Sequence, residues 1–204
     1  MDKYEIERRL WNEDFNRVMG LDEVGRGCLS GPVVAAGVIL KPGEEQILGI
    51  DDSKKIPAPK RRVIAEEIKK RSLFWTIQQC SPAEIDNLNI LHASIKAMMK
   101  CAESKIANPD YLLVDGNRFT SSIIPYSCVI KGDDKSASIG AASILAKVYR
   151  DELMHKLHEE VPYYGWDSNM GYPTKVHFEG LQKYGYSKYH RRSFKLRTDK
   201  VLSI

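Results

Sequence analysis

Three apolar segments of strand length in this sequence carry acidic residues where they end, with glycine close by, and this pattern constrains the fold most. The segments and their acids are 18–24 with Asp22 and Glu23, 111–114 with Asp115, and 128–131 with Asp133. Segments with helical periodicity lie between the strands, which favours a sheet that is at least partly parallel. In open α/β sheets, functional groups gather beyond the strand ends near a change in strand order. We therefore expect these acids to converge.

The rest of the chain also alternates between strand and helix signals. Segments 33–40 and 73–80 are predicted strands, and the turn signal Ser30-Gly31-Pro32 allows 18–24 and 33–40 to pair as a hairpin. Helices are predicted at 59–71, from the capping box Ser81-Pro82-Ala83-Glu84, at 91–106, at 142–157 and at 174–184. The prediction is an α/β fold in which a mixed β-sheet is flanked by helices. Residues 1–160 would form this core, and 161–204 a small C-terminal helical appendage.

Length and composition suit one globular domain with its own core. The chain has 204 residues, of which 43% are hydrophobic and 28% are charged. The first nine residues are charged and the longest apolar stretch is 33–40, so we expect no signal peptide and no membrane association. The four cysteines are far apart and lack zinc-site spacing, which favours free thiols and a cytoplasmic location. Because no assembly signal is present, we expect a monomer.

The C-terminal segment is strongly basic, although the net charge of the whole chain is only +4. Residues 183–200 contain seven lysines and arginines against one acid, and four aromatic residues lie between them. Basic side chains interleaved with aromatic rings suit a nucleic acid, because they bind phosphates and stack on sugars or bases. The alternative is a solvated basic tail without a partner.

Converging acids would need protons or cations to neutralise them. Two carboxylates about 4 Å apart repel each other by roughly 4 kcal/mol at an effective dielectric constant of about 20. Oxygen ligands favour hard ions, so we expect Mg²⁺ or Mn²⁺ rather than zinc. The alternative for each acid taken alone is a turn residue or a helix cap.

A set of ordered motifs extends from residue 18 to residue 194. The motifs are Gly20-Leu21-Asp22-Glu23-Val24-Gly25-Arg26-Gly27, Asp52-Ser53-Lys54-Lys55, Val114-Asp115-Gly116-Asn117-Arg118, Lys131-Gly132-Asp133, Ala141-Ala142-Ser143-Ile144-Leu145-Ala146-Lys147, Gly171-Tyr172-Pro173-Thr174 and His190-Arg191-Arg192-Ser193-Phe194. In this order and spacing the chain resembles bacterial ribonuclease HII, of the type 2 ribonuclease H family. The resemblance implies a ribonuclease H-like fold with four catalytic acids that bind metal: Asp22, Glu23, Asp115 and Asp133. Asp134, beside the last of them, is the alternative ligand.

The resemblance also implies an activity and a substrate. Two Mn²⁺ or Mg²⁺ ions would bind with the substrate, and the enzyme would hydrolyse the RNA strand of RNA/DNA hybrids. It would also cut on the 5′ side of ribonucleotides in duplex DNA, leaving 5′-phosphate and 3′-hydroxyl ends, as in ribonucleotide excision repair and DNA replication. The alternatives are a non-catalytic nucleic-acid-binding protein of the same fold, and a phosphatase or another nuclease of that fold.

Substrate-binding residues follow from the same motifs. The resemblance implies that Gly25, Arg26 and Gly27 read 2′-hydroxyl groups and that Tyr172 stacks on the sugar at the RNA-to-DNA junction. Candidate phosphate contacts are Lys54, Lys55, Lys147, Arg191 and Arg192. For His177 and His190 we expect a surface or structural role.

Overall fold

A five-stranded mixed sheet forms the centre of the protein. The computed structural model describes residues 2–50, 53, 56–120 and 123–195. The strands are β1 (Val18–Val24), β2 (Val33–Ile39), β3 (Phe74–Cys80), β4 (Tyr111–Asp115) and β5 (Tyr126–Val129). Their order is β3-β2-β1-β4-β5. β1 to β3 pair antiparallel, whereas β4 is parallel to β1 and β5 is parallel to β4. The mixed sheet flanked by helices confirms the predicted fold class.

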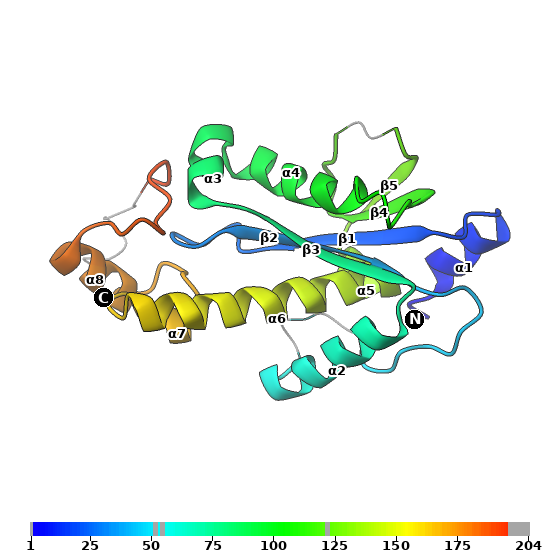
Figure 1. Ribbon diagram of the computed structural model, residues 1–204, viewed down its shortest axis with the longest axis horizontal. Helices are drawn as coiled ribbons and strands as arrows, with labels where there is room; N and C mark the ends of the chain where they lie inside the picture. The colour runs from blue at the N-terminus through cyan, green and yellow to red at the C-terminus, as the bar shows by residue number, and fades with distance from the viewer. Residues whose placement is uncertain (1, 51–52, 54–55, 121–122, 196–204) are drawn as a thin grey trace.

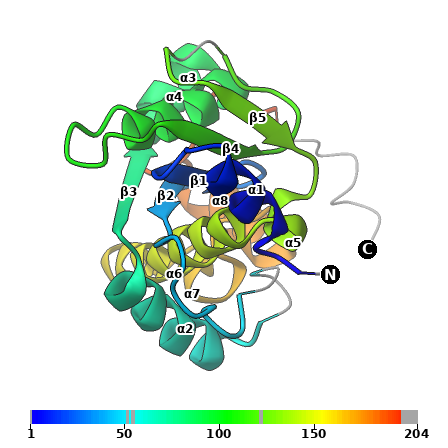
Figure 2. The same ribbon diagram turned by 90° about the vertical axis from the view of Figure 1, so that its right-hand side faces the viewer.

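Helices cover both faces of this sheet (Figure 1). α3 (Pro82–Leu88) and α4 (Ile90–Ala102) lie on one face, and α2 (Ala58–Arg71) and α6 (Ala137–Glu160) lie on the other, as the end-on view in Figure 2 also shows. Each face has its own apolar core: Leu21, Ala35 and Met98 belong to the core under α4, and Ala36, Ile68 and Ala141 to the core under α6. The sheet therefore lies between two buried layers, and its functional groups reach solvent only at its ends.

Short helices at the two ends of the sheet complete the fold. α1 (Glu5–Asn12) precedes β1, and α5 (Gly132–Lys135) leads directly into α6. α7 (Trp166–Asn169) and α8 (Lys175–Tyr184) lie at the far end of α6, opposite α1 (Figure 1). They pack there around Leu29, Met154 and Trp166. In the described part of the chain, no helix has the length and apolar character needed to cross a membrane.

Most predicted elements are confirmed, and the differences have local causes. The capping box is present, with the Ser81 hydroxyl and the Glu84 carboxylate each accepting a backbone N–H. The predicted helix 91–106 is wrong in extent, because α4 ends at Ala102 and leaves Ile106 exposed. The strand predicted at 128–131 is displaced to Tyr126–Val129, because Lys131 takes a left-handed conformation. Helices α1, α5 and α7 were not predicted.

Gly20 allows β1 to approach α6 closely enough to join the two layers. A Cβ atom at this position would lie 2.2 Å from the backbone carbon of Ser138. Because the atoms that this Cβ would meet belong to the backbone of Ser138 and Ile139, the contact cannot be relieved by a change of side-chain rotamer.

We predict that Gly20→Ala lowers the free energy of unfolding by about 3 kcal/mol, the upper range for overpacking a core. Gly43→Ala is the control, because a Cβ atom there meets nothing within 4 Å and only its positive φ of 74° causes strain. Urea denaturation measures both variants. Equal destabilisation by the two substitutions would contradict the close-packing argument.

Candidate active site

Asp22 and Glu23 lie near the end of β1, and Asp115 is the last residue of the neighbouring β4. Asp22 is only 7% exposed. Burial raises its pKa well above the usual value, and the charges of Glu23 and Asp115 raise it further. Burial likewise raises the pKa of Glu23, and Asp115 adds to this effect against the opposing influence of Arg26. These three acids therefore lie close together, as expected, and the charge of Asp115 disfavours ionisation of the other two.

Asp133 lies in α5, which the structure places against Asp115. The backbone N–H of Gly132 donates to Oδ1 of Asp115 over 2.7 Å. The next residue is Asp133, whose Oδ1 accepts from the backbone N–H of Asp134 at 3.1 Å. Asp134 and Asp133 are both half-buried, so exposure does not choose between them. Asp133 is thus brought beside the acid cluster through its neighbour Gly132.

The donor set suits a hard divalent cation, although the acids are turned toward protein donors. Among the residues that the structure describes, no three His, Cys, Asp or Glu side chains already stand in the arrangement of a metal site. Asp22 Oδ1 accepts from the Glu23 backbone at 2.7 Å, and Glu23 Oε1 contacts Arg26 at 3.3 Å. Neighbouring carboxylates that offer only oxygen ligands fit Mg²⁺ or Mn²⁺, since a cation would relieve their repulsion.

A surface cavity of about 310 Å³ opens beside these acids. Glu23 and Asp115 line it from the sheet, and α4 forms the opposite wall with Ser94 and Met98. Arg26 and Arg118 bring positive charge to the same cavity. An anionic ligand can therefore contact arginines while it lies next to the carboxylates.

Two buried arginines hold the segment 25–32, which follows β1, by hydrogen bonds to its backbone carbonyls. Arg191 is 1% exposed and donates to the carbonyls of Gly25, Arg26 and Gly31 over 2.7 to 3.0 Å. Burial lowers its pKa to about 10, so the guanidinium is still charged at neutral pH. The predicted phosphate contact by Arg191 is therefore corrected: its donors face backbone carbonyls, so it positions the loop.

Arg150 is the second of these arginines, and the sequence interpretation missed it. It is fully buried in α6 and donates to the carbonyls of Ser30, Pro32 and Met170. A Cβ atom at Gly25, where φ is +93°, would lie 2.2 Å from Nε of Arg150, so only glycine fits. Arg150 lies four residues from buried Ala146 and from buried Met154, and this spacing could have placed it on the buried face.

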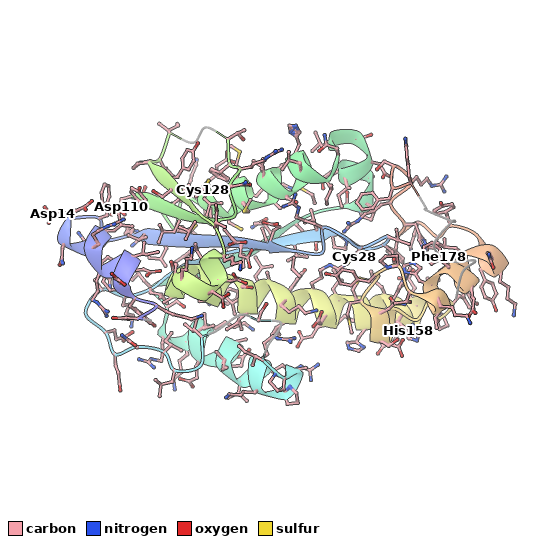
Figure 3. All side chains as sticks on the ribbon, turned by 180° about the vertical axis from the view of Figure 1, so that it is seen from behind. Asp14, Cys28, Asp110, Cys128, His158 and Phe178 are labelled. Atoms are coloured by element: carbon pink, nitrogen blue, oxygen red, sulfur yellow. The ribbon has the colours of Figure 1, made fainter. Side chains whose placement is uncertain are left out.

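Tyr172 lies next to the same loop, as the predicted substrate site requires. Its Cε1 is 3.6 Å from a Cβ atom built on Gly27, and the residue is 40% exposed. The backbone N–H of Leu29 donates to the carbonyl of Gly171 over 2.8 Å and joins the two loops. In Figure 3, Cys28 of the first loop and Phe178 of α8 lie at the same end of the molecule, opposite Asp14 and Asp110.

His177 and His190 form a buried pair beneath Tyr172, consistent with a structural role. The His190 Nδ1 accepts from the Ser187 N–H at 3.0 Å, so its Nε2 carries the proton and donates to Nε2 of His177 at 3.1 Å. The His177 Nδ1 then donates to the Tyr172 carbonyl at 2.9 Å. Both rings are neutral in this chain of bonds, which holds the backbone of Tyr172 in place.

The remaining basic candidates differ in their surroundings. Lys54 and Lys55 lie outside the described residues. Lys147 forms an ion pair with Asp151 at 2.7 Å and is largely shielded from solvent. Arg192 is exposed, and its backbone N–H donates to Asp86 on α3, which sequence reasoning did not single out. Arg192 therefore has the more accessible side chain for a phosphate contact.

Comparisons with known proteins fit this geometry. The family described as "Ribonuclease HII" matches residues 19–197. The chain belongs to the ribonuclease HII family. The ribonuclease HII of Salinibacter ruber is 48% identical over 197 residues, covering 95% of this chain and 98% of that protein.

Solved structures share the fold at lower identity. The ribonuclease H2 of Pyrococcus horikoshii has a TM-score of 0.76 at 23% identity, covering 91% of this chain and 97% of that one. Bst-RNase HIII, solved in complex with Mn²⁺, has a TM-score of 0.62 at 20% identity and covers 91% of this chain and 69% of its own. As a member of the ribonuclease HII family with this fold, the protein is an RNase H-type endonuclease.

We predict that Asp22→Asn stabilises the protein at pH 7 in the presence of EDTA. The raised pKa of Asp22 means that stability is lost as pH rises through the folded-state value, and asparagine has no such loss. Thermal unfolding with EDTA and with MnCl₂ measures the effect, and Mn²⁺ should stabilise the variant less than the native protein. Asp167→Asn, at an exposed aspartate of α7, is the control. A destabilised variant with an unchanged Mn²⁺ response would contradict the acid cluster.

We predict that the histidine pair makes the fold sensitive to acid. The pKa of His190 is lowered to about 4, and that of His177 is also lowered, in both cases mainly by burial. The unfolded chain then binds more protons below pH ~6.5, so stability falls as pH decreases from about 6.5 toward 4. His190→Asn should cost stability at pH 7.5 but flatten this decline in urea titrations. A decline as steep as that of the native protein would show that the pair does not cause it.

Proposed function

We propose that this protein cuts the RNA strand of RNA/DNA hybrids and cleaves on the 5′ side of ribonucleotides in duplex DNA. The proposal is based on two features that lie side by side at the ends of the central strands β1 and β4. The first is the cluster of Asp22, Glu23 and Asp115, and the second is the glycine loop that follows Glu23 directly. The scissile phosphate and the ribose beside it would contact these two features together.

We propose that Asp22, Glu23, Asp115 and Asp133 hold divalent metal. Two bound Mn²⁺ or Mg²⁺ ions would supply an activated water and would neutralise charge on the departing 3′ oxygen. The Mn²⁺ complex of Bst-RNase HIII supports the choice of ion. The four acids would hold these ions, which would bind the reacting phosphate, and no side-chain nucleophile is needed. The products would carry 5′-phosphate and 3′-hydroxyl ends.

We propose that the loop Gly25-Arg26-Gly27 and Tyr172 recognise the ribose. Arg191 holds the carbonyls of Gly25 and Arg26 on the inner side of the loop, whereas Arg26 and Gly27 are exposed residues and Gly27 lies beside Tyr172. A 2′-hydroxyl both donates and accepts hydrogen bonds, so backbone groups can distinguish it from deoxyribose. The half-exposed Tyr172 ring offers an apolar face to the adjoining sugar.

We predict that the protein, with MnCl₂ or MgCl₂, cuts a DNA duplex containing one ribonucleotide on its 5′ side. The matched all-DNA duplex should stay intact, because it lacks the 2′-hydroxyl. Asp115→Asn should lower the rate at least ~100-fold, in line with loss of a group that acts in the transition state. Gel analysis of end-labelled strands measures cleavage and the 5′-phosphate end.

Other outcomes of this assay would favour other functions. Binding of the ribonucleotide duplex without cleavage would favour a nucleic-acid-binding protein that retains the fold. Equal cutting of the all-DNA duplex would favour a general nuclease and overturn the assignment of the loop to ribose recognition.

A further inference from the structure

Glu7 is a fully buried acid that the proposed chemistry does not use. It lies on α1, before the first strand of the sheet. Its Oε1 accepts three hydrogen bonds: from the Ser136 hydroxyl at 2.5 Å, the Ser138 hydroxyl at 2.6 Å and the Ser138 backbone N–H at 2.9 Å. Burying a carboxylate is costly unless such donors compensate it, so this contact is specific.

The donors all belong to the beginning of α6. Ser136 is the N-cap of this 24-residue helix, and its hydroxyl also accepts from the N–H of Ile139. The N–H of Ala137 donates to the carbonyl of Lys3 over 2.8 Å. The N-terminal segment thus satisfies N–H groups that a helix leaves unpaired in its first turn, and a carboxylate is favoured there by the helix dipole.

The same junction carries Asp133. α5 ends at Lys135, one residue before the N-cap Ser136, so the two helices share this turn. The Lys3 ammonium donates to the Asp133 carbonyl over 3.0 Å. A Cβ atom on Gly140 would lie 3.0 Å from that carbonyl oxygen, so the first turns of α6 press against the backbone of Asp133. Asp133 is therefore held between the N-terminal segment and α6.

We propose that Glu7 is a positioning residue that fixes the junction of α5 and α6 and thereby places Asp133 beside Asp115 for metal binding. The proposal rests on the proposed function, which makes Asp133 a ligand. Glu7 acts through Ser136 and Ser138. Its effect passes along the junction to Asp133 and, through the Gly132 N–H, to Asp115.

Glutamine cannot replace Glu7 without loss. In the described part of the chain, the second carboxyl oxygen, Oε2, is buried without a hydrogen-bond partner. Glu7→Gln either places an amide NH₂ group there, with unpaired donors, or turns it toward the serine donors. In both orientations the attraction between a carboxylate and the positive end of α6 is lost.

We expect two effects of Glu7→Gln that can be measured without catalysis. In the metal-free protein, amides of residues 132–140 should exchange with deuterium faster than in the native protein. The Mn²⁺ affinity measured by calorimetry should fall about tenfold or more, as for loss of a group that orients a ligand. If this variant does not fold, Ser138→Ala removes one hydroxyl donor, leaves the backbone donor, and should show the same two effects more weakly.

Glu84→Gln is the matched control. Glu84 also caps a helix N-terminus, that of α3, and forms ion pairs with Lys96 and Lys100. It should lower stability and leave Mn²⁺ affinity unchanged. If Glu7→Gln or Ser138→Ala loses stability while Mn²⁺ affinity and exchange at 132–140 stay native, Glu7 serves only the fold and the inference is overturned.

Asp133→Asn separates this inference from the proposed function. If Asp133→Asn weakens Mn²⁺ binding and Glu7→Gln does not, the role of Glu7 alone is refuted. If Asp133→Asn binds Mn²⁺ like the native protein, the ligand assignment fails, and the proposed function must be revised together with the inference.

Discussion

Repulsion between carboxyl groups at the end of one pair of parallel strands is the constraint on which this site depends. Burial raises the pKa of Asp22 and of Glu23, and the charge of Asp115 raises both further. Folding therefore has to stabilise an arrangement that is unfavourable at neutral pH. The two packed cores and the close contact of Gly20 with α6 provide that stabilisation, because they fix β1, the strand that carries Asp22 and Glu23.

Buried positive charge organises the adjoining loop in a complementary way. Arg150 and Arg191 each donate to three backbone carbonyls in or beside the loop that follows Glu23. These bonds join β1 and the loop to α6 and to the C-terminal segment. The acid cluster and the loop thus become neighbouring parts of one site at the ends of the central strands.

The sequence predicted the strands well because their signal is local. Apolar runs ended by glycine identify β1 and β4, and the acids at their ends were expected to meet. α5 could not be predicted in this way, since a four-residue helix is too short to show periodicity. α1 was missed because it is rich in charged residues, and nothing in the sequence distinguishes the buried Glu7 from its exposed charged neighbours. The role of Arg191 was misassigned for a related reason: a basic residue in a basic segment suggests phosphate, and only the structure shows its carbonyl partners.

We propose that four acids together hold the ions that cleave the substrate: Asp22, Glu23, Asp115 and Asp133. A crystal structure with Mn²⁺ and a ribonucleotide-containing duplex, recorded at the manganese absorption edge, tests it most directly. We expect two anomalous peaks between these carboxylates and the phosphate on the 5′ side of the ribonucleotide, next to Gly25-Arg26-Gly27. Manganese bound elsewhere, with the four acids contacting only protein, would contradict it.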